Sequence, residues 1–298
     1  MIETFDATLP HGIALGCRAS GKPGAPLLVF LHGFPEAAFV WDELLEHFGD
    51  RYRCVAPNLR GFGPSSAPAE PEQYRVKHLL ADLDALIVHL GGGPLEALVA
   101  HDWGGAVAWT LAALRPELLK RLVIINSPHP ATFLRELQHN PAQQAASSYM
   151  NFLCRPDAEA LLAANDYARM WPMFSRAAGG ERIGPPWLTD AVRDQYRAVW
   201  DAGMTGGCNY YRASPLRPPT AQDASVMKIE FAPEYVTVKR PTLVIWAEDD
   251  IALPLPLIDG LDAYVPDLRL VRVPGATHWI VHERPAFIAA KIERHLAR

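Results

Sequence analysis

Asp102 stands where an apolar run ends and a helical pattern begins. The local sequence is Ala100-His101-Asp102-Trp103-Gly104, so small residues lie two positions before and two positions after the acid. Small flanks at this spacing are typical of a nucleophile elbow, a strained strand-to-helix turn that exposes one side chain, most often a serine. An aspartate in that place indicates direct attack on a carbon electrophile by a carboxylate, which gives a covalent ester.

A later step needs a base, because water must be activated to hydrolyse that ester. Elbow enzymes of this kind carry an acid and then a histidine farther along the chain. Asp250 follows the apolar run 241–246, and His278 follows the run 268–273. We therefore expect His278 to be the general base and Asp250 to fix its tautomer and stabilise the imidazolium.

Each of these residues also has an ordinary structural interpretation. An aspartate after a strand is usually a cap or turn residue, and a lone histidine is more often structural than catalytic. Their order along the chain, each at the end of an apolar run, favours catalysis. Glu248 and Asp249 stay open as competitors of Asp250. Of the other histidines, we expect His32 and His101 to be structural neighbours of the site and His282 to be a surface residue.

The elements that must position these side chains alternate between strands and helices. The runs expected to form strands are 27–31, 53–57, 95–100, 122–125, 241–246 and 268–273, and helical spacing covers 41–48, 76–90, 104–114 and 285–296. This alternation predicts a parallel sheet with helices on both faces. Two loosely alternating segments, 3–9 and 12–19, predict an opening antiparallel hairpin.

The pattern changes between residues 130 and 221. Several helix-like segments follow one another there without a strand-like apolar run, and aromatic residues are frequent. We interpret 130–221 as a helical insertion in an α/β core made of 1–129 and 222–298.

Composition narrows the class of protein. The 298 residues carry 28 basic and 33 acidic side chains, a net charge of −5, without a basic cluster. This charge pattern argues against nucleic acid and anionic membrane partners. No apolar run reaches the roughly 18–20 residues of a membrane span, and the first residues do not resemble a signal peptide. A cytoplasmic location is the expectation. The scattered Cys17, Cys54, Cys154 and Cys208 predict free thiols and no zinc site.

Taken together, these motifs resemble the α/β-hydrolase fold and, within it, the epoxide hydrolases that use an aspartate nucleophile. The resemblance covers nearly the whole chain, and the segments that carry it are His32–Glu36, Arg60–Ser66, His101–Gly105, Asp250, His278 and the insertion itself. It implies an eight-stranded, mostly parallel sheet with an inserted helical cap domain. It also implies an oxyanion hole made by the backbone N–H groups of Phe34 and Trp103. Ala100 departs from the glycine that is commoner there.

The same resemblance assigns two tyrosines of the insertion to the epoxide oxygen. Tyr149 matches the first of them and Tyr211 the second, with the adjacent Tyr210 as the alternative. A tyrosine with an ordinary pKa near 10 is suited to protonate the alkoxide formed on ring opening. The alternative without a catalytic role is that these aromatic side chains only line an apolar pocket. Pocket shape is expected to depend on Phe34, Trp103, Phe152 and Trp279.

Three alternatives stay open. Haloalkane and haloacetate dehalogenases share the fold and the aspartate, and Trp103 matches the halide-binding tryptophan of the former. However, Phe34 replaces a halide-binding asparagine, Trp103 and Ala106 replace carboxylate-binding arginines, and Asn126 stands where the acid is common. A non-catalytic ligand receptor on the same scaffold would not need His278, and an esterase would need a serine in the elbow.

The expected reaction is therefore the hydrolysis of a small apolar epoxide by water to a vicinal diol, without a metal or an organic cofactor. The natural epoxide, the regiochemistry and the enantiopreference are not given by the sequence. The oligomeric state is also left open, with a homodimer as one arrangement.

Overall fold

A mixed sheet lies at the centre of the structure, a computed structural model that describes residues 1–178 and 181–298. Within these residues the sheet has eight strands in the order β1-β2-β4-β3-β5-β6-β9-β10. The strands are β1 Glu3–Thr8, β2 Ala14–Ser20, β3 Leu27–Leu31, β4 Arg53–Pro57, β5 Ala97–His101, β6 Leu122–Ile125, β9 Thr242–Ala247 and β10 Leu268–Val273. Every predicted apolar run forms one of these strands, with small differences at the ends.

Strand direction follows the expected pattern. β1 pairs with β2 and β2 with β4 in antiparallel fashion, which confirms the opening hairpin. The other neighbours, from β4–β3 to β9–β10, are parallel. The carboxyl ends of β3, β5, β6, β9 and β10 therefore meet at one edge of the sheet, which is where side chains can converge from distant parts of the chain.

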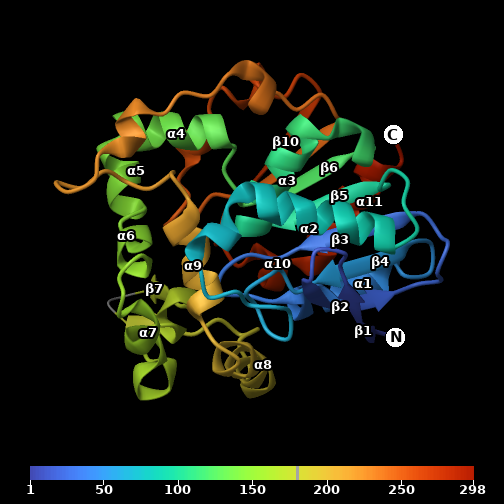
Figure 1. The fold of residues 1–298 in the computed structure, drawn as a ribbon, viewed down its shortest axis with the longest axis horizontal. Helices are drawn as coiled ribbons and strands as arrows, with labels where there is room; N and C mark the ends of the chain where they lie inside the picture. The colour runs from blue at the N-terminus through green and yellow to red at the C-terminus, as the bar shows by residue number, and fades with distance from the viewer. Residues whose placement is uncertain (179–180) are drawn as a thin grey trace.

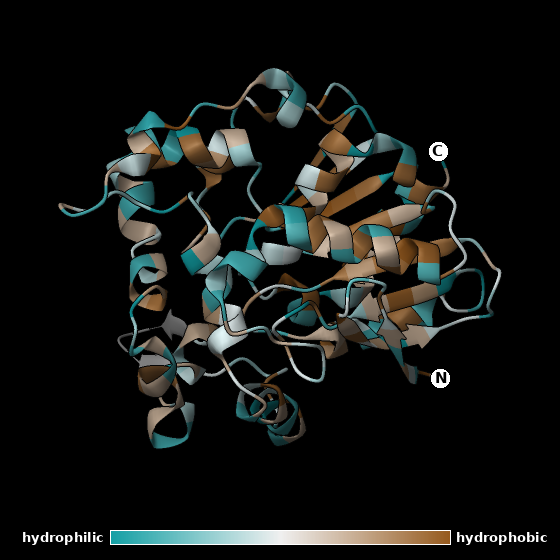
Figure 2. Ribbon diagram, viewed as in Figure 1, coloured by the Kyte–Doolittle hydropathy of each residue, from teal (hydrophilic) through white to brown (hydrophobic). Residues whose placement is uncertain are grey.

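Helices cover both faces of the sheet because the central strands are apolar on both sides. In β3, Val29 and Leu31 pack with α2 (Val76–His89) and α3 (Asp102–Leu114), whereas Leu28 and Phe30 pack with α1 (Asp42–Phe48) and α11 (Pro285–Leu296). Figure 2 shows these central strands as the most hydrophobic part of the ribbon. This burial explains why the runs that form them lack polar alternation.

A mainly helical segment is inserted between β6 and β9. Its helices are α4 Pro130–His139, α5 Pro141–Ala146, α6 Tyr149–Leu153, α7 Ala158–Tyr167, α8 Asp190–Asp201 and α9 Thr205–Ala213. They gather on the side of the molecule away from the two termini (Figure 1). The insertion also contains two short strands, β7 (Arg176–Ala178) and β8 (Glu181–Ile183), which pair antiparallel and which the sequence analysis did not predict. Three-residue strands are too short to leave a periodic signal.

The turn from β5 into α3 depends on close backbone packing. Asp102 opens α3 with φ 48°, a left-handed conformation that favours glycine. The helix then passes so near β3 that a Cβ atom on Gly104 would lie 2.5 Å from the carbonyl oxygens of Leu31 and His32. A Cβ atom on Gly105 would lie 2.3 Å from the Ser127 side chain. Neither position has room for a side chain, so both require glycine.

Two further observations complete the fold. A one-turn helix, α10 (Ile280–Glu283), follows His278 and precedes α11. No helix in the described part of the chain combines the length and the apolar character that crossing a membrane requires.

Replacing Gly104 by alanine is expected to destabilise the protein. Alanine ordinarily favours a helix over glycine, but here its methyl group would overlap the backbone of β3, at a cost of about 2–3 kcal/mol. Urea unfolding of Gly104→Ala measures this loss. Gly184→Ala is the control, because its nearest neighbour would be the Arg193 guanidinium at 3.8 Å. Equal stability of the two variants would contradict the argument.

Candidate active site

The Asp102 carboxylate is held at the carboxyl edge of the sheet with its two oxygens in different surroundings. Oδ1 accepts a hydrogen bond from the backbone N–H of Phe34, 2.8 Å away. Oδ2 lies 3.7 Å from Nε2 of His278. That distance is too long for a direct hydrogen bond. The Ser127 hydroxyl donates to the Asp102 carbonyl oxygen at 2.6 Å and so fixes the backbone of the turn.

His278 and Asp250 form a tight buried pair. Nδ1 of His278 lies 2.6 Å from Oδ2 of Asp250, so the other ring nitrogen faces Asp102. Oδ1 of Asp250 accepts the backbone N–H groups of Ala252 and Leu253 at 2.9 and 3.0 Å. The three predicted residues Asp102, Asp250 and His278 thus come together from loops after β5, β9 and β10.

Asn126 is a neighbour of Asp250 to which the sequence analysis gave no role in this site. It follows β6 in a left-handed conformation with φ 38°, and its side chain clamps the loop after β9. Its Nδ2 donates to Asp250 Oδ2 at 2.9 Å, and its Oδ1 accepts the Ala247 N–H at 2.8 Å. A polar residue at the end of a parallel strand is the signal that could have indicated this role.

The competitors of Asp250 are placed elsewhere. Glu248 accepts a hydrogen bond from Arg272 Nε at 2.7 Å, and Asp249 is exposed. Asp250 is the buried acid of the three. The order of the residues along the loop did not distinguish them, because the direction of each side chain depends on the turn.

The buried pair has shifted pKa values. Burial by itself would lower the pKa of His278, but the charge and hydrogen bond of Asp250, together with the charge of Asp102, raise it to about 9. Burial by itself would raise the pKa of Asp250, but the charge and hydrogen bond of His278 and the Asn126 amide lower it. The buried carboxylates thus favour the imidazolium form of His278.

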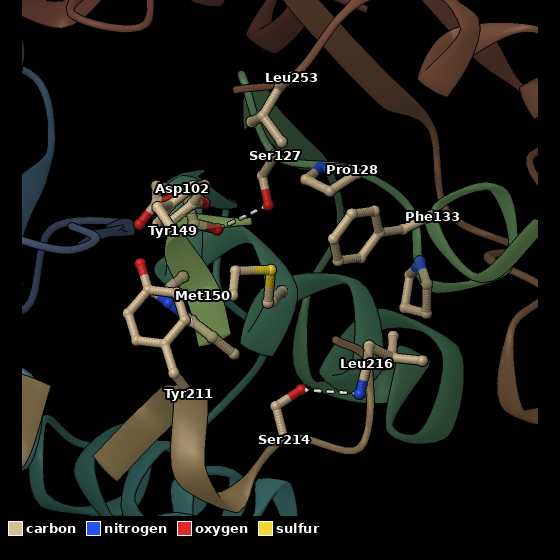
Figure 3. A pocket seen from close by; sticks show the side chains of 13 residues that line it. Asp102, Ser127, Pro128, Phe133, Tyr149, Met150, Tyr211, Ser214, Leu216 and Leu253 are labelled. Atoms are coloured by element: carbon tan, nitrogen blue, oxygen red, sulfur yellow. Dashed lines mark hydrogen bonds between the residues drawn. The ribbon is translucent and has the colours of Figure 1, made fainter. Parts of the chain in front are cut away.

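A pocket opens beside Asp102 on the side of the insertion (Figure 3). Among the described residues, its lining is mostly apolar, and Asp102 is its charged member. The lining residues are Asp102, Trp103, Ala106, Ser127, Pro128, Pro130, Phe133, Tyr149, Met150, Tyr211, Ser214, Leu216 and Leu253. An apolar pocket with a few convergent polar groups is the usual form of a small-molecule site.

Tyr149 and Tyr211 meet in this pocket. Tyr149 comes from the start of α6 and Tyr211 from α9, and their rings lie edge to face with centroids 5.9 Å apart. The hydroxyl of Tyr211 points toward Asp102 and Tyr149 (Figure 3). The alternative Tyr210 is placed differently, because its hydroxyl donates to the Arg60 carbonyl oxygen at 3.0 Å, away from the pocket.

The pKa values of both pocket tyrosines differ from the ordinary value that the sequence analysis assumed. Burial, followed by the charges of Asp102 and Asp250, raises the pKa of Tyr149 well above 10. Burial, the neighbouring Tyr149 and the charge of Asp102 raise the pKa of Tyr211 in the same direction. Both hydroxyl groups are therefore neutral donors throughout the physiological range.

Of the four residues predicted to shape the pocket, one lies in its lining and three lie outside it. Trp103 belongs to the described lining, whereas Phe34, Phe152 and Trp279 do not. Phe34 packs edge-on against Tyr211, with ring centroids 5.4 Å apart. Phe152 lies under the Arg155 guanidinium, and Trp279 donates to the Met173 carbonyl oxygen at 3.0 Å. Contact of these three with substrate stays a prediction.

The neighbouring histidines differ from one another. His32 is fully buried, accepts the Leu59 N–H at its Nε2, and has a pKa lowered by burial to about 4. His101 lies between the Glu36 carboxylate and the His278 carbonyl oxygen, as an immediate neighbour of the site. The prediction of a surface His282 is wrong, because its side chain is 12% exposed and contacts Glu36. Helix α10 turns it inward, and Glu36 itself was not singled out.

No cluster of histidine, cysteine and acidic side chains suited to a metal ion occurs in residues 1–178 and 181–298. The four cysteines are free thiols, and three of them are buried.

Comparisons with known proteins agree with this fold. A family model described as the alpha/beta hydrolase fold matches residues 26–285. Epoxide hydrolase 4 of Mus musculus is 32% identical over 285 residues, which cover 93% of this chain and 74% of the relative. The AB hydrolase superfamily protein YfhM of Bacillus subtilis (strain 168) is 35% identical over 290 residues, which cover 96% and 95% of the two chains.

Solved structures extend the similarity to the whole fold. One of the novel epoxide hydrolases from metagenomes of hot environments is 35% identical, with a TM-score of 0.85 and 99% of each chain covered. The Bacillus megaterium epoxide hydrolase in complex with an inhibitor is 26% identical, with a TM-score of 0.87 and coverage of 99% of this chain and 100% of the other.

The raised pKa of His278 predicts a pH-dependent stability. Because its pKa rises from 6.5 to about 9 on folding, its contribution is complete below pH 6.5 and is lost as the pH increases through 9. The free energy of unfolding of the unmodified protein should fall by on the order of 3 kcal/mol more than that of His278→Gln over this range.

Denaturant unfolding at several pH values measures the difference. His139→Gln is the matched control, because it replaces an exposed histidine at the end of α4. Parallel pH profiles for the unmodified protein and His278→Gln would contradict the assignment of the buried pair.

Proposed function

The chain belongs to the alpha/beta hydrolase fold family and, within it, to the epoxide hydrolases, and we propose that it opens epoxides through a covalent ester on Asp102. The protein is accordingly a hydrolase. The substrate class is a small apolar epoxide, because the described pocket lining offers no charged side chain besides Asp102.

One observation carries this proposal: the two oxygens of Asp102 face different partners. Oδ1 accepts a hydrogen bond from the Phe34 N–H at 2.8 Å, while Oδ2 faces Nε2 of His278. An ester formed through Oδ2 leaves Oδ1 as the carbonyl oxygen, already on a hydrogen-bond donor. The Trp103 N–H is the second proposed donor, because N–H groups in the first turn of a helix have no partner within it.

In the first step, Asp102 Oδ2 attacks an oxirane carbon and the carbon–oxygen bond of the ring breaks. Tyr149 and Tyr211 donate hydrogen bonds to the ring oxygen, and one of them transfers its proton to the developing alkoxide. Their raised pKa values keep both phenols neutral and able to donate hydrogen bonds, although they also make them weaker acids. The proton passes to the ring oxygen because an alkoxide is ordinarily a stronger base than a phenolate.

In the second step, His278 removes a proton from water, and the resulting hydroxide attacks Cγ of the ester. Esterification removes the negative charge of Asp102, one of the charges that raise the pKa of His278. Loss of that charge lowers the pKa of His278 and so favours its neutral form, which is the form that can act as a base. Asp250 stabilises the imidazolium that forms. Collapse of the tetrahedral intermediate breaks the bond between Cγ and the alcohol oxygen, and the diol leaves with the carboxyl proton as the Asp102 carboxylate is restored. The proton held by His278 then returns to the tyrosinate left by the first step.

The insertion supplies the acid side of the site and the core supplies the base side. Because the two parts supply different groups to the site, we assign 130–221 to a cap domain and 1–129 with 222–298 to the hydrolase core. Ala106 lies in the pocket lining where a carboxylate-binding arginine would indicate a haloacetate dehalogenase. Asn126, bonded to Asp250, occupies the strand end at which dehalogenases commonly carry the acid.

Single-turnover reaction with a styrene-type epoxide in ¹⁸O-labelled water tests the ester. The label should enter the Asp102 carboxylate on the first turnover, because water attacks Cγ and the diol receives an oxygen from aspartate. Asp102→Asn should form no ester, and His278→Gln should accumulate it. Label found only in the first diol would indicate direct attack by water. Halide release from a haloalkane without diol formation from the epoxide would identify a dehalogenase.

The two tyrosines should act on the first step. Tyr149→Phe and Tyr211→Phe are each expected to slow ester formation about 100-fold or more, as loss of a general acid does. Stopped-flow tryptophan fluorescence follows that step. Tyr210→Phe is the control, because its hydroxyl is bonded to Arg60 outside the pocket, and it should form the ester nearly as fast as the unmodified protein. Equal losses in all three variants would argue against the acid role.

A further inference from the structure

A buried polar cluster joins the insertion to the floor of the candidate site. It consists of Glu36, His101, Tyr196 and His282, here called the Glu36 cluster. Glu36 lies in the loop after β3 and His101 at the end of β5, both buried, and Tyr196 belongs to helix α8 of the insertion. No step of the proposed reaction uses this cluster directly.

His101 links Glu36 to the loop that carries His278. His101 Nδ1 lies 2.9 Å from the Glu36 carboxylate, and its Nε2 lies 3.0 Å from the His278 carbonyl oxygen. His101 therefore bridges the Glu36 carboxylate and the His278 carbonyl oxygen through its two ring nitrogens. This contact holds the backbone of His278, whose side chain faces Asp102.

The second carboxylate oxygen of Glu36 accepts a hydrogen bond from the insertion. The Tyr196 hydroxyl donates to Glu36 Oε1 at 3.2 Å, and His282 Nε2 lies 2.9 Å from that hydroxyl and 3.3 Å from the carboxylate. One turn farther along α8, Trp200 Nε1 donates to the Pro35 carbonyl oxygen at 2.9 Å. Helix α8 is thus bonded twice to the loop that follows β3.

This loop also carries the Phe34 N–H that binds Asp102 Oδ1. His282 lies in α10, directly after the His278 loop, and its ring stacks on Trp187 of the insertion with centroids 4.3 Å apart. One carboxylate consequently gathers groups from the oxyanion loop, the nucleophile strand, the base loop and the insertion.

We propose that Tyr196, together with His282, is a positioning residue: by donating to Glu36 it couples the docking of helix α8 to the placement of the His278 loop. The inference rests on the proposed function for its consequence in catalysis. Its structural content, that loss of the hydroxyl changes the surroundings of His278, holds for the protein without substrate.

The direction of the effect follows from the charges around His278. Asp250, Asp102 and Glu36 are the negative groups that favour its imidazolium, and the His101 ring lies with its centroid 4.6 Å away. The hydroxyl groups of Tyr149 and Tyr211 are neutral. Without the Tyr196 donor, the charge of Glu36 is less well compensated. The titration of His278 should therefore move to higher pH.

Two pairs of variants test the proposal. Tyr196→Phe removes the hydroxyl and keeps a ring that packs on Phe39 and Phe174. Tyr167→Phe is its control, because it removes a hydroxyl bonded to Asp201 within the insertion and leaves Glu36 untouched. His282→Phe keeps a ring against Trp187 but no donor, whereas His282→Gln restores an N–H donor.

The first measurement needs no substrate. In ¹⁵N-histidine NMR, with His278 assigned by comparison with His278→Gln, the His278 titration should move to higher pH in Tyr196→Phe and His282→Phe. It should stay unchanged in Tyr167→Phe and nearly unchanged in His282→Gln. An unchanged or lower titration in Tyr196→Phe overturns the proposal. The His282 pair decides the question where Tyr196→Phe fails to fold.

The second measurement follows the rates of ester formation and ester hydrolysis. Ester hydrolysis in Tyr196→Phe should slow about fivefold, the size of one net hydrogen bond, and its acid limb should move to higher pH, with ester formation less affected. A loss that only follows the fraction of folded protein overturns the coupling. Absence of epoxide turnover in the unmodified protein would refute the proposed function, and the NMR titration would still decide on Tyr196.

Discussion

Asp102 is held with φ 48°, and the remainder of the site is arranged around that strained turn. Such a conformation costs on the order of 1–3 kcal/mol in a residue other than glycine and persists only where neighbours enforce it. The Phe34 N–H holds the side chain, and the Ser127 hydroxyl holds the carbonyl group. Gly104 lets the following helix lie against β3. The carboxylate is thereby fixed before any substrate arrives.

Each buried charge near this turn is compensated by a group from another strand end. Asp250 after β9 is paired with His278 after β10 and held by Asn126 after β6. Glu36 after β3 is paired with His101 at the end of β5. A buried charge without a partner would be costly. The ionic groups therefore hold the loops of the candidate site relative to one another.

The sequence predicted the core well and the surroundings of the site less well. Strands and helices of the core were predictable because two-sided burial leaves continuous apolar runs. The short hairpin β7–β8 left no such signal. Burial also raised the pKa of both pocket tyrosines, and it brought His282 inward. Such effects depend on neighbours that lie far away in the sequence.

By itself, the sequence indicated which residues are candidates for the reaction. The elbow around Asp102, with Asp250 and His278 behind later strands, is a local pattern, and parallel strands place their carboxyl ends together. Only the tertiary structure decided which acid faces the histidine, and which of Tyr210 and Tyr211 enters the pocket. Adjacent residues on a loop or a helix differ in direction, and the direction is set by packing rather than by residue type.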